Sequence, residues 1–115
     1  PRNLIGGHLL SAFIGVSAYK LFSGNIWLCS AFAVSTSILV MQLTLTLHPP
    51  GGATALIAVI GGDGIHELGF LYLLVPVLSG SFILLVIAFI VNNIPKDRHY
   101  PLSSIKFNEK WLSDD

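Results

Sequence analysis

Two long stretches of the sequence contain no charged side chain, and they limit what the chain can fold into. One lies between Lys20 and Asp63, and the other lies between Glu67 and Lys96. Charged residues make up only 10% of the chain, whereas they make up about 25% of a typical soluble domain. Uncharged apolar runs of this length are typical of membrane spans. The sequence therefore predicts an integral membrane protein surrounded by membrane lipid.

Three apolar segments are long enough to cross a bilayer as helices, namely Leu4 to Phe22, Ile26 to Leu47 and Leu68 to Val91. A fourth segment, Gly51 to Gly61, would be only about 17 Å long as a helix. We expect it to be a half-helix that is either crossing or re-entrant, followed by a polar loop from Gly61 to Glu67. The predicted fold class is all-α, a polytopic membrane helix bundle with three long helices and this half-helix. Residues 1–100 would form the membrane domain, and 101–115 a polar C-terminal tail or connector.

Small residues and helix breakers predict how these segments pack. Gly7, Ser11 and Gly15 recur at a spacing of four, which places them on one face of the first helix. Such a stripe of small side chains lets another helix approach closely. Pro76 and Gly80 should kink the first half of the last segment.

A stretch of two prolines and two glycines separates the second segment from the half-helix. Proline has no N–H group and pushes the residue before it out of the helical region, so this stretch should end one helix. Proline is also tolerated in a first helical turn, so the same stretch can begin the next one. We expect the N–H groups from Gly51 to Thr54 to be free and to attract an anion. The predicted substrate-binding residues are His48, Pro49, Pro50, Gly51, Gly52, Ala53 and Thr54, with Gln42 and Thr46 along one wall.

Each of these residues also has a structural interpretation. His48 either caps the preceding helix or bonds a backbone carbonyl, or it lines a pore or site where it gates, senses pH or contacts an anion. Gly51 and Gly52 serve either close helix packing or the close approach of a ligand. Gln42 and Thr46 share one face of the second predicted helix with Ser35. That face should point into the protein, where these side chains serve either as interhelical hydrogen-bonding groups or as ligands.

Three further residues are candidates to support this site from behind the residues that would contact the substrate. His8 lies about one turn into the first segment, where it is either a satisfied interior histidine or a direct participant. Asn92 and Asn93 end the last segment, and their simplest role is to cap its helix.

Several classes of function find no support in the sequence. The single cysteine, Cys29, permits neither an internal disulfide nor a cysteine-based metal site. No nucleophile elbow, phosphate-binding loop or zinc-protease motif is present, so we predict no enzymatic activity, catalytic residue, metal or cofactor. The net charge is zero, which argues against binding to nucleic acid. The sequence does not decide whether the protein forms a homo-oligomer.

Four blocks of sequence together resemble the HPP family of integral membrane proteins. They are Pro1-Arg2-Asn3-Leu4-Ile5-Gly6-Gly7-His8-Leu9-Leu10-Ser11-Ala12, Met41-Gln42-Leu43-Thr44, His48-Pro49-Pro50-Gly51-Gly52-Ala53-Thr54-Ala55-Leu56 and Val91-Asn92-Asn93. The resemblance runs from Pro1 to about Pro101. The family usually has alanine at the position of Gly51.

The resemblance implies a bacterial or plastid membrane protein with about four spans. Plastid and cyanobacterial members look like nitrite transporters, and some bacterial members continue into a CBS regulatory region. It also implies a further span before Pro1, which this chain lacks. We therefore expect a transporter of a small inorganic anion, nitrite first, in a bacterial inner membrane. The alternative is a membrane anchor or regulatory module for a soluble, CBS-like partner.

Overall fold

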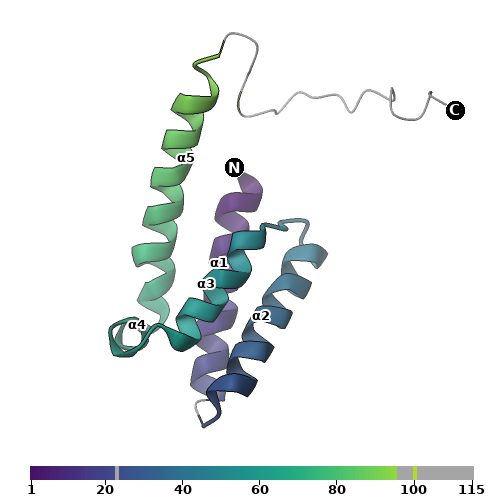
Figure 1. The fold of residues 1–115 in the computed structure, drawn as a ribbon, viewed down its shortest axis with the longest axis vertical. Helices are drawn as coiled ribbons and strands as arrows, with labels where there is room; N and C mark the ends of the chain where they lie inside the picture. Colours follow the sequence, from purple (N-terminus) through teal and green to yellow (C-terminus); the bar gives the residue numbers. More distant parts are fainter. Residues whose placement is uncertain (23, 96–99, 101–115) are drawn as a thin grey trace, which may run out of the picture. The chain divides into compact units, whose positions relative to one another are not determined.

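The computed structural model describes residues 1–22, 24–95 and 100, and every regular element among them is helical. This confirms the predicted all-α fold class. The described residues fall into two compact units, one covering residues 1–85 and a second that begins at Val86. In the first unit, α1 (Arg2–Leu21), α2 (Ile26–Leu43) and α3 (Pro49–Ile60) pack side by side (Figure 1).

Helix α3 runs parallel to α1, and this direction decides how the half-helix is placed. A Cβ atom added to Gly7 would lie 2.7 Å from the Cβ of His48, the residue just before α3. At the other end of α1, Tyr19 stacks on His66, which lies beyond the end of α3, with ring centroids 3.7 Å apart. The half-helix therefore follows α1 in the same direction, from its second turn to its last turn, which favours the crossing alternative over the re-entrant one.

The contact between α1 and α3 depends on small side chains, as the stripe of Gly7, Ser11 and Gly15 predicts. A Cβ atom on Gly15 would lie 2.6 Å from the carbonyl oxygen of Ala55 and 2.8 Å from the Cβ of Ala58. These distances are shorter than van der Waals contact, so the two backbones meet where a side chain is missing.

The predicted orientation of α2 is wrong. Its buried residues recur every four positions, and they are Cys29, Ala33, Ser37 and Met41. Ser35 and Gln42 are exposed and face away from this packed side. The helix also ends at Leu43 instead of Leu47, so Thr46 lies outside it and does not share a helical face with Gln42.

The proline-rich stretch begins α3 as predicted. His48 is the N-cap in an extended conformation, and Pro49 and Pro50 occupy the first two helical positions. The helix ends at Ile60, before Gly61. The loop predicted from Gly61 to Glu67 is wrong in part, because residues Asp63–Leu68 form the short helix α4.

The last apolar segment is interrupted before it becomes a regular helix. A 3₁₀ turn, η1 (Gly69–Leu73), leads into a π-helical turn, η2 (Leu74–Leu78), and then into α5 (Ser79–Asn92). Val75 has extended dihedral angles, φ −132° and ψ 117°, because the residue before a proline is driven out of the helical region. This confirms the predicted kink at Pro76.

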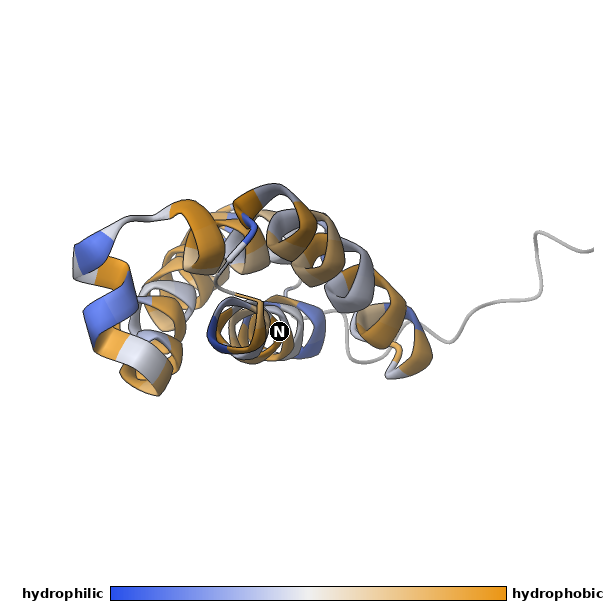
Figure 2. Cartoon of the chain, turned by 90° about the horizontal axis from the view of Figure 1, so that it is seen from below, coloured by the Kyte–Doolittle hydropathy of each residue, from blue (hydrophilic) through white to orange (hydrophobic). Residues whose placement is uncertain are grey.

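The described residues have the surface of a membrane protein. Three helical stretches are long and apolar enough to cross a bilayer, namely Arg2–Leu21, Ile26–Leu43 and Asp63–Asn92. Hydrophobic residues cover most of the ribbon, and hydrophilic ones gather in a few short patches (Figure 2). The predicted tail, 101–115, lies outside the described residues.

Candidate functional site

Three polar side chains from separate parts of the sequence meet where α3 begins. Nδ1 of His8, on α1, lies 2.7 Å from Oγ1 of Thr54 on α3. The ring of His48 approaches the ring of His8 edge to face, with centroids 4.9 Å apart and planes inclined by 67°. The absence of a side chain at Gly7 leaves room for His48 in this position. The fold thus forms a His8–Thr54–His48 cluster.

Two members of the cluster, His8 and Thr54, line an open cavity of about 210 Å³ in the first unit. His8 and Thr54 supply polar groups from α1 and α3, and Ser81 supplies a hydroxyl from the first turn of α5. The other lining residues are apolar or lack a side chain, and they are Pro76, Val77, Gly80 and Leu84. A few convergent polar groups in an otherwise apolar hollow are typical of small-molecule sites.

Tyr72 joins the interrupted segment to α3 at this cluster. Its ring is buried, and its hydroxyl donates a hydrogen bond of 3.1 Å to the backbone carbonyl of Thr54. The η1 turn that carries Tyr72 leads directly into η2, which supplies Pro76 and Val77 to the cavity. The wall of the cavity is therefore tied to the residue that bonds His8.

The backbone between α2 and α3 is held by the start of α1. Nη2 of Arg2 donates to the carbonyl of Thr44 at 3.0 Å, and Nδ2 of Asn3 donates to the carbonyl of Leu47 at 3.3 Å. The hydroxyls of Thr44 and Thr46 lie 2.8 Å apart. These bonds satisfy carbonyl groups of a segment that has no helical hydrogen-bonding partners.

The prediction of free N–H groups at the start of α3 is wrong for Gly51. Pro49 and Pro50 have no N–H group, and the N–H of Gly51 donates to the carbonyl of His48 at 2.8 Å. A Cβ atom on Gly51 would lie 2.8 Å from Sδ of Met41 and 2.9 Å from Oγ of Ser11. Gly51 thus serves helix packing, and its N–H is not available to an anion.

The other predicted site residues are dispersed. Gln42 is exposed at the end of α2, and Thr46 is buried beside Gly6, and neither lines the cavity. Gly52 faces Val34 and Ile38 of α2 at ordinary contact distance.

The remaining predicted site residues lie on the surface of the first unit or in the second. Pro49, Pro50 and Ala53 are exposed. Asn92 and Asn93 belong to the second unit, where their side chains donate to the carbonyls of Ala88 and Phe89 at 2.7 Å. These bonds match the predicted capping role.

Sequence reasoning missed two residues of this region. Tyr72 is a polar aromatic group in an apolar run, and a buried tyrosine hydroxyl usually finds a partner. The sequence therefore indicated that the Tyr72 hydroxyl needs a hydrogen-bond partner. It could not indicate that the partner is a backbone carbonyl of α3. Ser81 carries no comparable signal, because a serine in an apolar helix commonly bonds its own backbone.

The fold and the apolar surface define an integral membrane protein built of helices. Residues 1–101 match the family described as HPP, transmembrane region, and the chain belongs to this family. It is 50% and 44% identical to two transmembrane proteins of Dictyostelium discoideum, each over 105 residues and 89% of this chain. It spans only 36% and 33% of their lengths, respectively. No solved structure matches the chain.

Proposed function

We propose that the chain forms part of a transporter for a small inorganic anion, with nitrite as the first candidate. The observation that carries the proposal is the cavity of about 210 Å³ lined by His8, Thr54 and Ser81. Polar groups inside a membrane-spanning bundle are costly unless they have partners, so their convergence on one hollow favours a pathway. The proposal includes no catalytic step, metal or cofactor.

The geometry supports weak binding that allows release. Two hydroxyls and one imidazole face the cavity, and the described residues that line it include no permanently charged side chain. A transported ion must bind well enough to enter and weakly enough to leave. The Ser81 hydroxyl can donate one hydrogen bond to an oxygen atom of a small oxyanion, and the Thr54 hydroxyl positions the ring of His8 through their 2.7 Å contact.

The test is uptake into proteoliposomes that contain the full-length protein. Nitrite, nitrate, chloride and formate would be compared in wild type, Thr54→Val and Ser81→Leu. Thr54→Val removes a hydroxyl at nearly constant shape, and we expect nitrite uptake to fall about tenfold, equivalent to about 1.4 kcal/mol. Ser81→Leu fills the cavity and should abolish uptake.

Ser79→Leu is the matched control for the cavity-filling variant. It makes the same chemical change two residues away, at an exposed position that does not line the cavity. Its uptake should equal that of wild type. Equal uptake by Ser79→Leu and Ser81→Leu would contradict the proposed location of the pathway.

One observation favours a second function. The curated relatives are about three times as long as this chain, which covers 36% and 33% of them. A membrane anchor or regulatory module for a soluble partner, such as a CBS-like region, would account for such additional length. Absence of uptake of every anion by folded full-length protein would favour this function. Residence in a bacterial inner membrane stays a prediction, which membrane fractionation of the source cells tests.

A further inference from the structure

We propose that the cavity takes up its anion together with one proton, and that His8 holds this proton on its ring. The inference rests on the proposed function and names its coupling ion. It follows from three observations: the hydrogen bond between His8 and Thr54, the distance from His8 to the carboxylates within residues 1–22 and 24–95, and the position of the His48 ring.

The hydrogen bonds point to one ring nitrogen of His8 as the available one. The Thr54 hydroxyl lies 2.7 Å from Nδ1 of His8 and can donate its one proton to the carbonyl of Pro50 at 3.4 Å. In the tautomer that we assign, this proton goes to Pro50 and the Nδ1–H of His8 donates to the hydroxyl. In the neutral ring this leaves Nε2 without a proton. Nε2 can therefore accept a proton from water, after which it becomes a hydrogen-bond donor.

A protonated His8 has no negative partner among the described residues that pack around it. On α3 it meets Thr54 and, just before that helix, His48. The residues of η2 and α5 that face the cavity carry no ionisable group.

The other ionisable groups near the cluster do not supply a negative charge. The hydroxyl of Tyr72 is already bonded to Thr54, and the nearest residue of α2 beside Gly7 is Met41. The charged group at this end of α1 is Arg2, a cation bonded to the carbonyl of Thr44.

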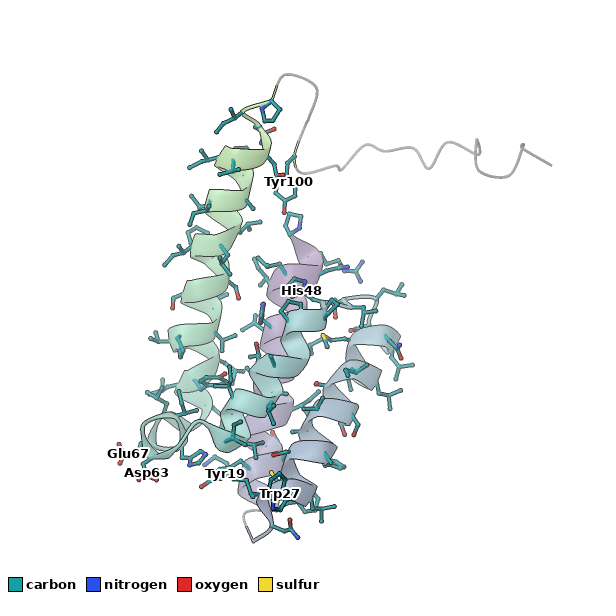
Figure 3. All side chains as sticks on the ribbon, viewed as in Figure 1. Tyr19, Trp27, His48, Asp63, Glu67 and Tyr100 are labelled. Atoms are coloured by element: carbon teal, nitrogen blue, oxygen red, sulfur yellow. The ribbon has the colours of Figure 1, made fainter. Side chains whose placement is uncertain are left out.

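The carboxylates of the described residues lie at the far end of α3. Asp63 and Glu67 are exposed on α4, whereas His48 precedes the first turn of α3 (Figure 3). The helix between them is about 18 Å long. An imidazolium in an apolar bundle without a counter-charge is unfavourable, and a bound anion removes that cost. Because linkage is reciprocal, the proton raises the affinity for the anion by the same factor.

The second histidine limits the number of protons to one. The rings of His8 and His48 are close enough, at 4.9 Å between centroids, that two positive charges would repel each other. A site that holds one proton and one monovalent anion is electrically neutral. The proton comes from the aqueous phase with the anion and leaves with it, and no covalent bond of the anion is formed or broken.

The test imposes a pH gradient on proteoliposomes that hold the full-length protein, with the membrane potential clamped at zero. Protein-free vesicles measure the passive leak of nitrous acid, which is subtracted. We expect a gradient of about one pH unit, acid outside, to drive about tenfold accumulation of nitrite through wild type, as one-to-one coupling requires. In His8→Gln, which cannot hold the proton, nitrite uptake should fall, and the uptake that remains should not respond to the pH gradient.

His66→Gln is the matched control, because His66 stacks on Tyr19 at the far end of α3 and bonds the carbonyl of Val59. It should retain full coupling. Coupling that persists in His8→Gln would overturn the assignment to His8. If nitrite uptake by wild type does not depend on the pH gradient, proton coupling is wrong, but the proposal of anion transport is not contradicted. Absence of any uptake would instead refute the transport proposal.

A second measurement needs neither transport nor a variant. Nitrite is added to detergent-solubilised full-length protein in weak buffer at pH 7.5 or above, and a pH indicator dye reports proton uptake. We expect about one proton to be taken up for each nitrite bound. Binding without proton uptake would overturn the inference even if His8→Gln does not fold.

Discussion

Leu45 adopts a backbone conformation that leucine disfavours, at the point where the chain leaves α2. Its φ is +54°, in the left-handed region. Its N–H donates to the carbonyl of Gln42 at 3.2 Å, and the N–H of Thr46 donates to the carbonyl of Met41 at 2.9 Å. These two bonds form a Schellman motif, in which glycine is the usual residue at the position of Leu45. The motif turns the chain toward His48.

Leu45→Gly should therefore stabilise the protein by about 1 kcal/mol, because glycine adopts this conformation without the steric cost. Leu43→Gly is the matched control. The two leucines are equally exposed, at 73% and 74%, but Leu43 is helical, so glycine there should cost about 1 kcal/mol. Thermal unfolding of the full-length protein in detergent measures both. Equal destabilisation by the two variants would contradict the strain at Leu45.

Single residues were predictable where they act on their own backbone. Pro49 and Pro50 end one helix and begin another through their missing N–H groups, and Pro76 displaces Val75 from the helical region. The N–H of Gly51 was not predictable in the same way, because its partner is a carbonyl brought close by the turn itself. The hydrogen bond between His8 and Thr54 joins residues 46 positions apart, and no local pattern predicts it.

At the scale of the elements, the contact between α1 and α3 depends on the absence of a side chain at Gly15. Gly15→Ala would place a Cβ atom 2.6 Å from the backbone oxygen of Ala55, so the helices must separate. We expect a loss of about 1–3 kcal/mol in stability. Gly52→Ala is the control, since its Cβ would meet its nearest neighbour at 3.8 Å and alanine favours a helix.

Thermal unfolding of the two variants separates packing from helix propensity, which alanine improves at both positions. Gly15→Ala should unfold at lower temperature than wild type, and Gly52→Ala at the same temperature or higher. A Gly15→Ala variant as stable as Gly52→Ala would contradict the close approach of α1 and α3.

The buried face of α2 could not be predicted, for a physical reason. In a soluble protein the polar face of a helix points to water, but in lipid both faces of a helix can be apolar. We expected polarity to mark the inner face, through Ser35 and Gln42. The inner face of α2 is instead distinguished by the small size of its side chains, because residues such as Ala33 and Ser37 let α1 and α3 approach. The stripe on α1 was predicted correctly because it was identified by size.

For the molecule as a whole, the parallel course of α1 and α3 determines which loops share a side of the membrane. The turn between α1 and α2 contains Gly24, and α4, after α3, contains Gly64. If α3 crosses with α1, these two glycines lie on the same side, and Leu45, between α2 and α3, lies on the opposite side. A re-entrant half-helix would instead place Gly64 on the side of Leu45.

Cysteine labelling distinguishes these arrangements. In full-length protein without other cysteines, Gly24→Cys, Gly64→Cys and Leu45→Cys would be treated with an impermeant maleimide in sealed vesicles of known orientation. A Cβ atom at Gly24 or Gly64 meets no other atom within 4 Å, so both substitutions should be tolerated. We expect Gly24→Cys and Gly64→Cys to be labelled from one side and Leu45→Cys from the other. If Gly64→Cys is labelled from the same side as Leu45→Cys, α3 is re-entrant. In that case α3 does not run alongside α1, and the His8–Thr54–His48 cluster, which depends on that pairing, does not form.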